Sequence, residues 1–381
     1  ARPLQLRTAL SLTPPTPASD LERRFLAPFL DRHFGHDFPV LDYVRAQRDN
    51  RLPPHIEIEE FYLQSGALLG KPDAQRRYAS LDYTHVARAV ASRGVDAVGQ
   101  LAAASPDGRR LSLSCNPDLT FDLLDEIRRR GTPRPLLIAE VHPDLPWLSG
   151  QAEVAADFFD AVLDLPGPAP PLFALPRTPV SDAEYAIGLY ASALVKDGGT
   201  LQIGIGALSD ALCHALILRH TRNADYRCLL RALWPDVETS PLIAREGGLA
   251  PFVRGLYCAS EMVMGGFAHL VDAGILTRRV LDDIELMRRD AAGTLDATDR
   301  ETLRREGQFL HGGFWLGSKD FLRWLRNLPP EIERGIGMTR ISHVNELYGG
   351  HEELERLQRR DARFFNTCMM MSALGAATSD A

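Results

Sequence analysis

Long apolar runs and paired cysteines are both missing from this chain. No stretch approaches the roughly 18 consecutive apolar residues that read as a transmembrane helix, so no membrane span is expected. The five cysteines are scattered, odd in number and form no Cys-x-x-Cys pair. We therefore predict neither a disulfide framework nor a zinc site. We expect all five to be small buried apolar residues in a cytoplasmic protein.

Several signatures of catalysis and binding are absent as well. No Gly-x-Ser-x-Gly elbow occurs, which disfavours an α/β-hydrolase serine, and no Gly-x4-Gly-Lys-Ser/Thr phosphate loop is present. The segment His351–Glu355 is not a His-Glu-x-x-His motif, and the histidines do not cluster with carboxylates at ligand spacing, so no metal is expected. The net charge of -7 argues against a nucleic-acid partner.

The composition and the proline distribution indicate two globular domains. Hydrophobic residues make up 45% and charged residues 24% of the 381 residues, and that length exceeds one typical compact domain. Prolines crowd the stretch Leu165–Pro179, where fixed φ and missing N–H groups exclude a helix or a central strand. We predict a first domain over residues 1–165, a linker over 166–180 and a second domain over 181–381.

Strand and helix patterns alternate on both sides of this linker. We predict strands at His55–Phe61, Leu136–Val141, Thr200–Ile203 and Leu256–Ser260, and helices at Thr84–Ser92, Leu119–Arg130, Asp182–Val195, Ala207–Leu218, Asp320–Arg326, Glu352–Arg360 and after Gly266. Thr84 is the expected N-cap of its helix. This alternation is typical of an α/β fold with parallel sheets.

A glycine turn follows one of the predicted strands. Gly204-Ile-Gly206 lies between a strand and a helix, where backbone can approach a ligand and the helix N-terminus favours negative charge. Ser209 occupies the place of a third glycine, so the segment is weak evidence for a dinucleotide site. A tight turn without any ligand explains the local pattern equally well.

Glu261 is the strongest candidate for a catalytic residue. It follows the predicted strand Leu256–Ser260 and precedes a helix, and ligands of open α/β sheets bind outside the carboxyl ends of strands. A carboxylate at that place can act as a nucleophile, because attack on a thioester divides one difficult step into two. A solvent-facing acid or a capping group remains the alternative.

A set of short segments, taken in order, resembles the acetyl-CoA hydrolase/transferase family of CoA transferases. The segments are Tyr83–Arg88, Cys115–Thr120, Asp197–Ala207, Ser260–Met262, Leu270–Ile275, His311–Gly317, Val344–Gly349 and Gln358–Asn366. The resemblance extends over nearly the whole chain, and the order of the segments is more specific than any one of them.

The resemblance implies a fold of two open, parallel-sheet α/β domains of the NagB/RpiA/CoA-transferase type. It places Glu261 at the family's catalytic glutamate and the segment Gln202, Ile203, Gly204 to Gly206 beside CoA and the oxyanion. Asn345 matches a polar position near that site. The implied substrates are a short-chain acyl-CoA, with acetyl-CoA foremost, and a small carboxylate, and the implied assembly is a homodimer.

The ends of the chain depart from the family pattern. The initial strand and glycine loop are expected to be missing, and the chain ends where the family continues into a second glycine-rich segment. Besides a CoA transferase that works through a glutamyl-CoA thioester on Glu261, two alternatives stay open. One is an acetyl-CoA hydrolase that uses the same glutamate, since the family name covers both activities, and the other, given the missing ends, is a non-catalytic CoA-binding relative.

Overall fold

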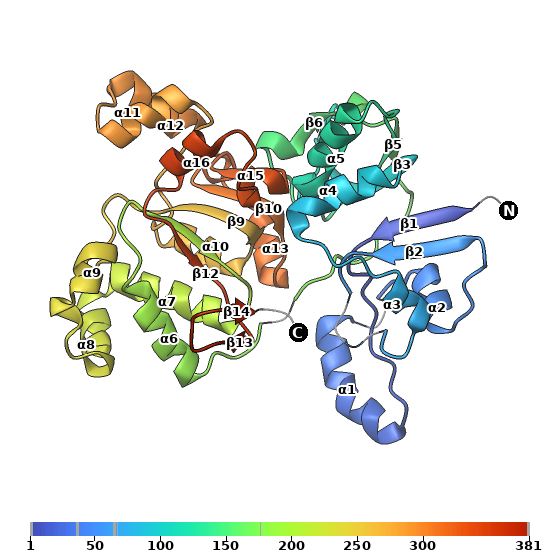
Figure 1. The fold of residues 1–381 in the computed structure, drawn as a ribbon, viewed down its shortest axis with the longest axis horizontal. Coiled ribbons are helices and arrows are strands. Elements are labelled where there is room, and N and C mark those ends of the chain that lie inside the picture. The colour runs from blue at the N-terminus through green and yellow to red at the C-terminus, as the bar shows by residue number, and fades with distance from the viewer. Residues whose placement is uncertain (1–2, 36–37, 64–65, 67, 176, 379–381) are drawn as a thin grey trace.

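The predicted α/β class is confirmed by the structure. The computed structural model describes residues 3–35, 38–63, 66, 68–175 and 177–378. Two five-stranded sheets, one in each half of the chain, are covered by helices (Figure 1). We call the residues up to 165 the N-terminal half and the residues from 181 the C-terminal half.

The C-terminal half is built on a parallel sheet with the strand order β11-β10-β9-β8-β12. Its strands are β8 (Thr200–Ile203), β9 (Tyr257–Val263), β10 (Leu310–Trp315), β11 (Ile336–Met338) and β12 (Arg363–Phe365). The chain moves outward from β8 to β11 and then returns to the other side of β8 with β12. The order therefore reverses beside β8, which is where open α/β sheets form ligand crevices.

The C-terminal half has helices on both faces of this sheet and further helices packed outside them. These helices are α6 (Asp182–Ser192), α7 (Ala207–Thr221), α8 (Asn223–Leu233), α9 (Pro241–Glu246), α10 (Gly265–Asp272), α11 (Ile284–Ala292), α12 (Ala297–Glu306), α13 (Lys319–Arg326), α14 (Pro330–Glu333), α15 (Ile341–Asn345) and α16 (Glu352–Gln358). Cys258 of β9 packs with residues of α7 and α10, whereas Tyr257 and Ala259 pack with residues of α11, α12 and α16. Alternate residues of β9 thus face different helix layers.

The N-terminal half contains a mixed sheet with the order β6-β4-β3-β5-β7. Its strands are β3 (Ala97–Ala104), β4 (Arg110–Ser112), β5 (Leu136–Val141), β6 (Glu153–Ala155) and β7 (Ala161–Leu163). The strands β3, β5 and β7 are parallel, and β4 and β6 add to the β3 edge in antiparallel fashion. The helices α4 (Tyr83–Ser92) and α5 (Pro117–Arg129) accompany this sheet.

The first part of the chain forms a separate parallel pair of strands, β1 (Leu4–Thr8) and β2 (Ile56–Glu60). The helices α1 (Asp20–His33), α2 (Asp42–Arg48) and α3 (Pro72–Arg76) lie near this pair (Figure 1). A short antiparallel hairpin of β13 (Met370–Met371) and β14 (Ala377–Thr378) follows β12. The strand β2 was predicted from the sequence, and β1 was not.

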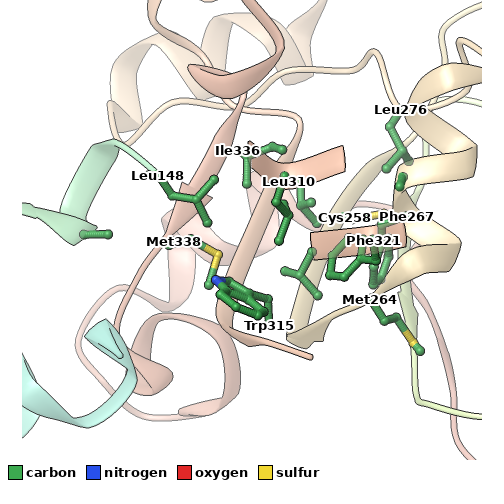
Figure 2. Close-up of a cluster of buried hydrophobic side chains, with 14 of the residues drawn as sticks. Leu148, Cys258, Met264, Phe267, Leu276, Leu310, Trp315, Phe321, Ile336 and Met338 are labelled. Carbon is green, nitrogen blue, oxygen red and sulfur yellow. The ribbon is translucent and has the colours of Figure 1, made fainter. Parts of the chain in front are cut away.

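The two halves share one hydrophobic core. Leu148, from the N-terminal half, points toward Ile336 and Met338 of β11 and lies in the same cluster of buried side chains (Figure 2). The described residues between 166 and 180 form no helix or strand, and Pro176 of the predicted linker lies outside the described residues. The division into two domains with a linker stays a prediction.

Three local expectations are corrected. The strand that we ended at Ser260 runs on to Val263, because Met262 and Val263 still pair with Phe314 and Trp315 of β10. Glu261 therefore lies within β9 and not after it.

The second correction concerns the start of α4, where Asp82 is the N-cap and accepts a hydrogen bond from the backbone N–H of Thr84. The third concerns the cysteines. All five lie in the described part of the chain as free thiols, but Cys228 and Cys368 are exposed and Cys115 is only partly buried. The expectation that all five are buried is wrong, since helix and loop surfaces accept single cysteines.

Candidate active site

Glu261 projects from the face of the sheet that also bears Tyr257 and Ala259. In the pairing of β9 with β10, Ser260 is opposite Gly312 and Met262 is opposite Phe314, so Glu261 lies opposite Gly313. On the other side of β9, Cys258 pairs with Leu201 of β8. Three residues further along both strands, Glu261 is level with Gly204, the first residue of the glycine turn. The Ser260 hydroxyl donates to the Ile203 carbonyl at 3.4 Å, which follows the same register. The candidate nucleophile therefore lies beside the start of the glycine turn.

Asn345 is in contact with this carboxylate. Its side-chain amide Nδ2 donates a hydrogen bond of 2.6 Å to Oε2 of Glu261. Hydrogen bonds to a charged group are shorter and stronger than neutral ones, so this bond fixes the orientation of the carboxylate. The structure thus brings together two of the predicted site residues that are 84 positions apart in the chain.

The helix α15, which ends at Asn345, is held from the N-terminal half. The Asp122 carboxylate of α5 accepts from the backbone N–H of Ser342 at 3.1 Å and from its hydroxyl at 2.7 Å. Arg340, just before α15, donates to Asp125 at 2.6 Å. These bonds place the short helix over the sheet and so determine where the Asn345 amide lies.

Gly313 makes room for α15 at this point. A Cβ at Gly313 would lie 2.9 Å from the side chain of Ile341 and 3.1 Å from the carbonyl oxygen of Glu261. The first separation is shorter than real Cβ atoms essentially ever show, and the second is tighter than most real Cβ contacts. The glycine is therefore required by the close approach of α15 to β9 and β10.

The predicted glycine turn lies at the carboxyl end of β8. The N–H of Gly204 donates to the Phe365 carbonyl at 3.3 Å, so this group is used within the sheet. Gly206 has φ +118°, which favours glycine, and it serves as the N-cap of α7 without a side-chain capping bond. The first intrahelical bonds run from the N–H groups of Ser209 and Asp210 to the Gly206 carbonyl. The N–H groups of the residues just before Ser209 point out of the helix start.

The remaining predicted site residues, Gln202 and Ile203, contribute differently. Gln202 shares the face of Glu261, and its Nε2 donates to Oδ1 of Asn366 at 3.4 Å. Its Oε1 is buried and has no hydrogen-bond partner among the described protein atoms. The Ile203 side chain is 1% exposed and packs in the core, so only its backbone can border a ligand.

Two adjoining cavities open at the carboxyl ends of β8, β9 and β10, on the side of α7 and α10. The smaller, of about 80 Å³, is lined by residues that include Gly206, Met264 and Leu316, and the larger, of about 320 Å³, by residues that include His214 and His269. Arg177 borders both cavities. Glu261 lines neither, because it faces the α15 side of the same sheet edge.

The N-terminal half adds a cluster that the sequence analysis did not assign to the site. Tyr83, the first residue of α4, donates its hydroxyl proton to Asp118 in the first turn of α5. Its ring meets Phe314 of β10 edge-on, with centroids 5.8 Å apart. Burial, followed by the charges of Asp118 and Glu261, raises the pKa of Tyr83. Tyr83 therefore lies within the electrostatic reach of the candidate nucleophile.

Cys115 borders this cluster but is a poor nucleophile. Burial raises the pKa of its thiol to about 12, with a further contribution from Asp118. A cysteine reacts as the thiolate, which is scarcely populated at neutral pH under these conditions. Of the reactive side chains that meet here, Glu261 is thus the better nucleophile.

The described ranges carry neither a metal-binding cluster nor a membrane-spanning helix. Within them, no group of three or more histidine, cysteine, aspartate or glutamate side chains is arranged to hold a metal ion. None of the helices in these ranges has both the length and the apolar character needed to cross a membrane.

Two curated CoA transferases match short segments of this chain. No family model matches the chain. A segment of 88 residues is 35% identical to the 4-hydroxybutyrate coenzyme A transferase of Clostridium kluyveri, covering 23% of this chain and 19% of that protein. A segment of 81 residues is 35% identical to the succinyl-CoA:cyclohexane-1-carboxylate CoA transferase of Geobacter metallireducens, covering 21% and 18%. The matches thus span about a fifth of the length of these curated relatives.

Solved structures extend the likeness to the whole fold. RipA from Yersinia pestis superposes with a TM-score of 0.60 at 18% identity, over 98% of this chain and 72% of that one. Mutant forms of RipA give similar values, with TM-scores up to 0.61. At this identity the likeness shows the fold alone. Over the segments that match, the curated relatives bear out the predicted resemblance to CoA transferases.

Proposed function

We propose that the protein is a CoA transferase that moves CoA between a short-chain acyl-CoA and a small carboxylate through a glutamyl-CoA thioester on Glu261. The observation that carries the proposal is the hydrogen bond from Asn345 to the Glu261 carboxylate at the carboxyl edge of the parallel sheet. The similarity to CoA transferases supports it, and acetyl-CoA is the first donor to test.

The proposed reaction begins when a Glu261 carboxylate oxygen attacks the thioester carbonyl carbon. The C–S bond breaks, CoA leaves as a thiolate, and a mixed anhydride joins the acyl group to Glu261. The CoA thiolate then attacks the glutamyl carbonyl of the anhydride, which releases the first carboxylate and leaves a glutamyl-CoA thioester. An acceptor carboxylate repeats these steps in reverse, so that the new acyl-CoA departs and Glu261 is regenerated.

Each tetrahedral intermediate carries an oxyanion that needs hydrogen-bond donors. Because the Gly204 N–H is bonded to Phe365, we place this role on the N–H groups from Ile205 to Leu208, at the uncapped start of α7. One such donor is typically worth about 3 kcal/mol of transition-state stabilisation. The smaller cavity borders this helix start at Gly206, and Arg177 is a nearby cation.

The experiment supplies acetyl-CoA with and without an acceptor, in separate reactions with propionate, succinate, 4-hydroxybutyrate and cyclohexane-1-carboxylate. Acceptor-dependent loss of acetyl-CoA with formation of the new acyl-CoA supports transfer. Equal release of free CoA with and without an acceptor would instead identify an acetyl-CoA hydrolase.

Trapping separates both enzymes from a non-catalytic CoA-binding relative. Mass spectrometry after incubation with acetyl-CoA, with borohydride reduction of the thioester, should show a change confined to the peptide that carries Glu261. An unmodified peptide together with unaltered CoA affinity in Glu261→Ala would favour the non-catalytic alternative. A homodimer and a cytoplasmic location stay predictions.

A further inference from the structure

Two polar side chains, Tyr83 and Asp118, meet where the N-terminal half faces β9 and β10. Tyr83 donates a hydrogen bond to Asp118, and its helix α4 packs against α15, which ends at Asn345, the hydrogen-bond partner of Glu261. Both Tyr83 and Asp118 are partly buried, and each lies in the first turn of its helix. The edge-on contact with Phe314 fixes the plane of the tyrosine ring against β10.

We propose that Tyr83 is a hydrogen-bond donor to the reacting oxygens on Glu261 and that Asp118 is the positioning residue that sets the direction of its O–H bond. This inference rests on the proposed function, because it assigns a role in the same reaction. When Asp118 is ionised it can only accept, and the Tyr83 O–H is directed to it in the hydrogen bond that the two side chains form. Neutral Asp118 instead donates its own proton to the Tyr83 oxygen, which leaves the Tyr83 O–H free to turn toward Glu261.

A hydrogen bond from Tyr83 would stabilise the negative charge that forms on the oxygens bonded through Glu261 during the reaction. A phenol between two carboxylates can donate to only one of them at a time. An acyl oxygen bonded to Glu261 becomes negative in each tetrahedral intermediate, and a neutral donor aimed at it lowers the barrier. The proton that distinguishes the two orientations comes from solvent and binds Asp118, so the covalent steps of transfer are unchanged.

The groups that surround Asp118 set its titration. The pKa of Asp118 is raised to about 6: desolvation is the largest cause, the Tyr83 hydroxyl and backbone N–H groups oppose it, and the nearby Asp122 carboxylate adds to the rise. Cys115 stays a neutral thiol, and Glu261 acts on the cluster through Tyr83. Tyr83 remains protonated, because its own pKa is raised. Asp118 therefore changes charge near neutrality while its tyrosine partner does not.

The test measures kcat and KM for acyl-CoA and carboxylate between pH 5 and 8 in wild type, Tyr83→Phe and Asp118→Asn. Wild-type kcat should fall as the pH rises through about 6, because ionised Asp118 withdraws the donor. Tyr83→Phe should lower kcat about 10- to 100-fold at pH 5 with little change in KM, and it should lose this pH dependence. Asp118→Asn, whose amide N–H can donate to the Tyr83 oxygen, should keep activity and also lose the pH dependence.

Two matched controls test for structural damage. Tyr62→Phe removes a hydroxyl from an exposed tyrosine of the same half, and Asp73→Asn neutralises an exposed carboxylate. Both should retain the wild-type rate and pH profile. If Asp118→Asn does not fold, the rate and the pH profile of Tyr83→Phe are sufficient to test the proposal.

The outcomes also separate this inference from the proposed function. Glu261→Gln with wild-type turnover would overturn both. An inactive Glu261→Gln protein combined with a fully active Tyr83→Phe protein, or with an unchanged pH profile in either variant, would overturn only the role of Tyr83 and Asp118.

Discussion

The two halves of the molecule reach the candidate site in different ways. The C-terminal half supplies Glu261 from the interior of β9, a strand with parallel neighbours on both sides. The N-terminal half reaches it through α4 and α5, whose first turns carry Tyr83 and Asp118. A strand within a sheet holds its residues rigidly, whereas side chains at helix starts depend on how the two halves pack.

This difference divides the work between the halves. The C-terminal half provides the group that we propose forms covalent bonds, and the N-terminal half controls the groups around it. The helix α5 does so twice, because Asp118 contacts Tyr83 while Asp122 holds α15 and thereby Asn345. A change in the first half should therefore tune the reaction, and a change at Glu261 should end it.

The largest effect is expected for Glu261→Gln. The amide keeps the shape of the side chain but cannot form the anhydride, so kcat should fall at least about a thousandfold, as for other enzymes without their nucleophile. Turnover of acetyl-CoA with a carboxylate acceptor measures the loss, and circular dichroism checks the fold. The exposed Glu301→Gln serves as the control. Residual turnover above a tenth of the wild-type rate would remove Glu261 from the mechanism.

Asn345→Ala should have the next largest effect. It deletes the amide that donates to Oε2 of Glu261, and hydrogen bonds to charged groups are worth about 1.5–3 kcal/mol. We expect kcat to fall roughly 10- to 100-fold with KM for acyl-CoA changed much less. Steady-state kinetics with both substrates distinguishes this from weaker binding. A rise in KM alone would show that Asn345 binds substrate and does not orient the carboxylate.

The sequence alone predicts the parts of this site that depend on local patterns. Thr200–Ile203 is a strand as expected, because an apolar run ends at a glycine turn. Glu261 could be selected because it lies between motifs in a characteristic order. Its position inside β9 could not, since the last residues of that strand are extended by pairing with β10, which is far away in the chain.

The contacts made by the N-terminal half could not be predicted from the sequence, for a different reason. Asp122 and Ser342 are 220 positions apart, and neither has a distinctive sequence context. The segments around Tyr83 and Asp118 resemble the family, but no local rule shows that their two side chains meet. Such contacts follow from the packing of two sheets, which periodicity does not encode.

Asp122→Ala should test whether the N-terminal half controls Asn345. The variant removes both bonds to Ser342, and we expect a loss of about 1–3 kcal/mol in the free energy of unfolding together with a smaller loss of kcat than in Asn345→Ala. Denaturant unfolding and kinetics measure the two effects. A double-mutant cycle with Ser342→Ala should give a coupling of about 0.5–3 kcal/mol. Additive single effects would show that this contact does not link the halves.

The smallest effect is expected for Asp144→Asn, which breaks another contact between the halves. Asp144 accepts from Arg326 at 2.7 Å, but their side chains are 57% and 40% exposed. Solvent screens exposed pairs of this kind, so the free energy of unfolding should change by no more than about 1 kcal/mol, and less at high salt. The rate of acyl transfer should stay at the wild-type value. If Asp144→Asn lowered activity as much as Asp122→Ala, any contact between the halves would affect the reaction. The contacts of α5 would then have no particular role.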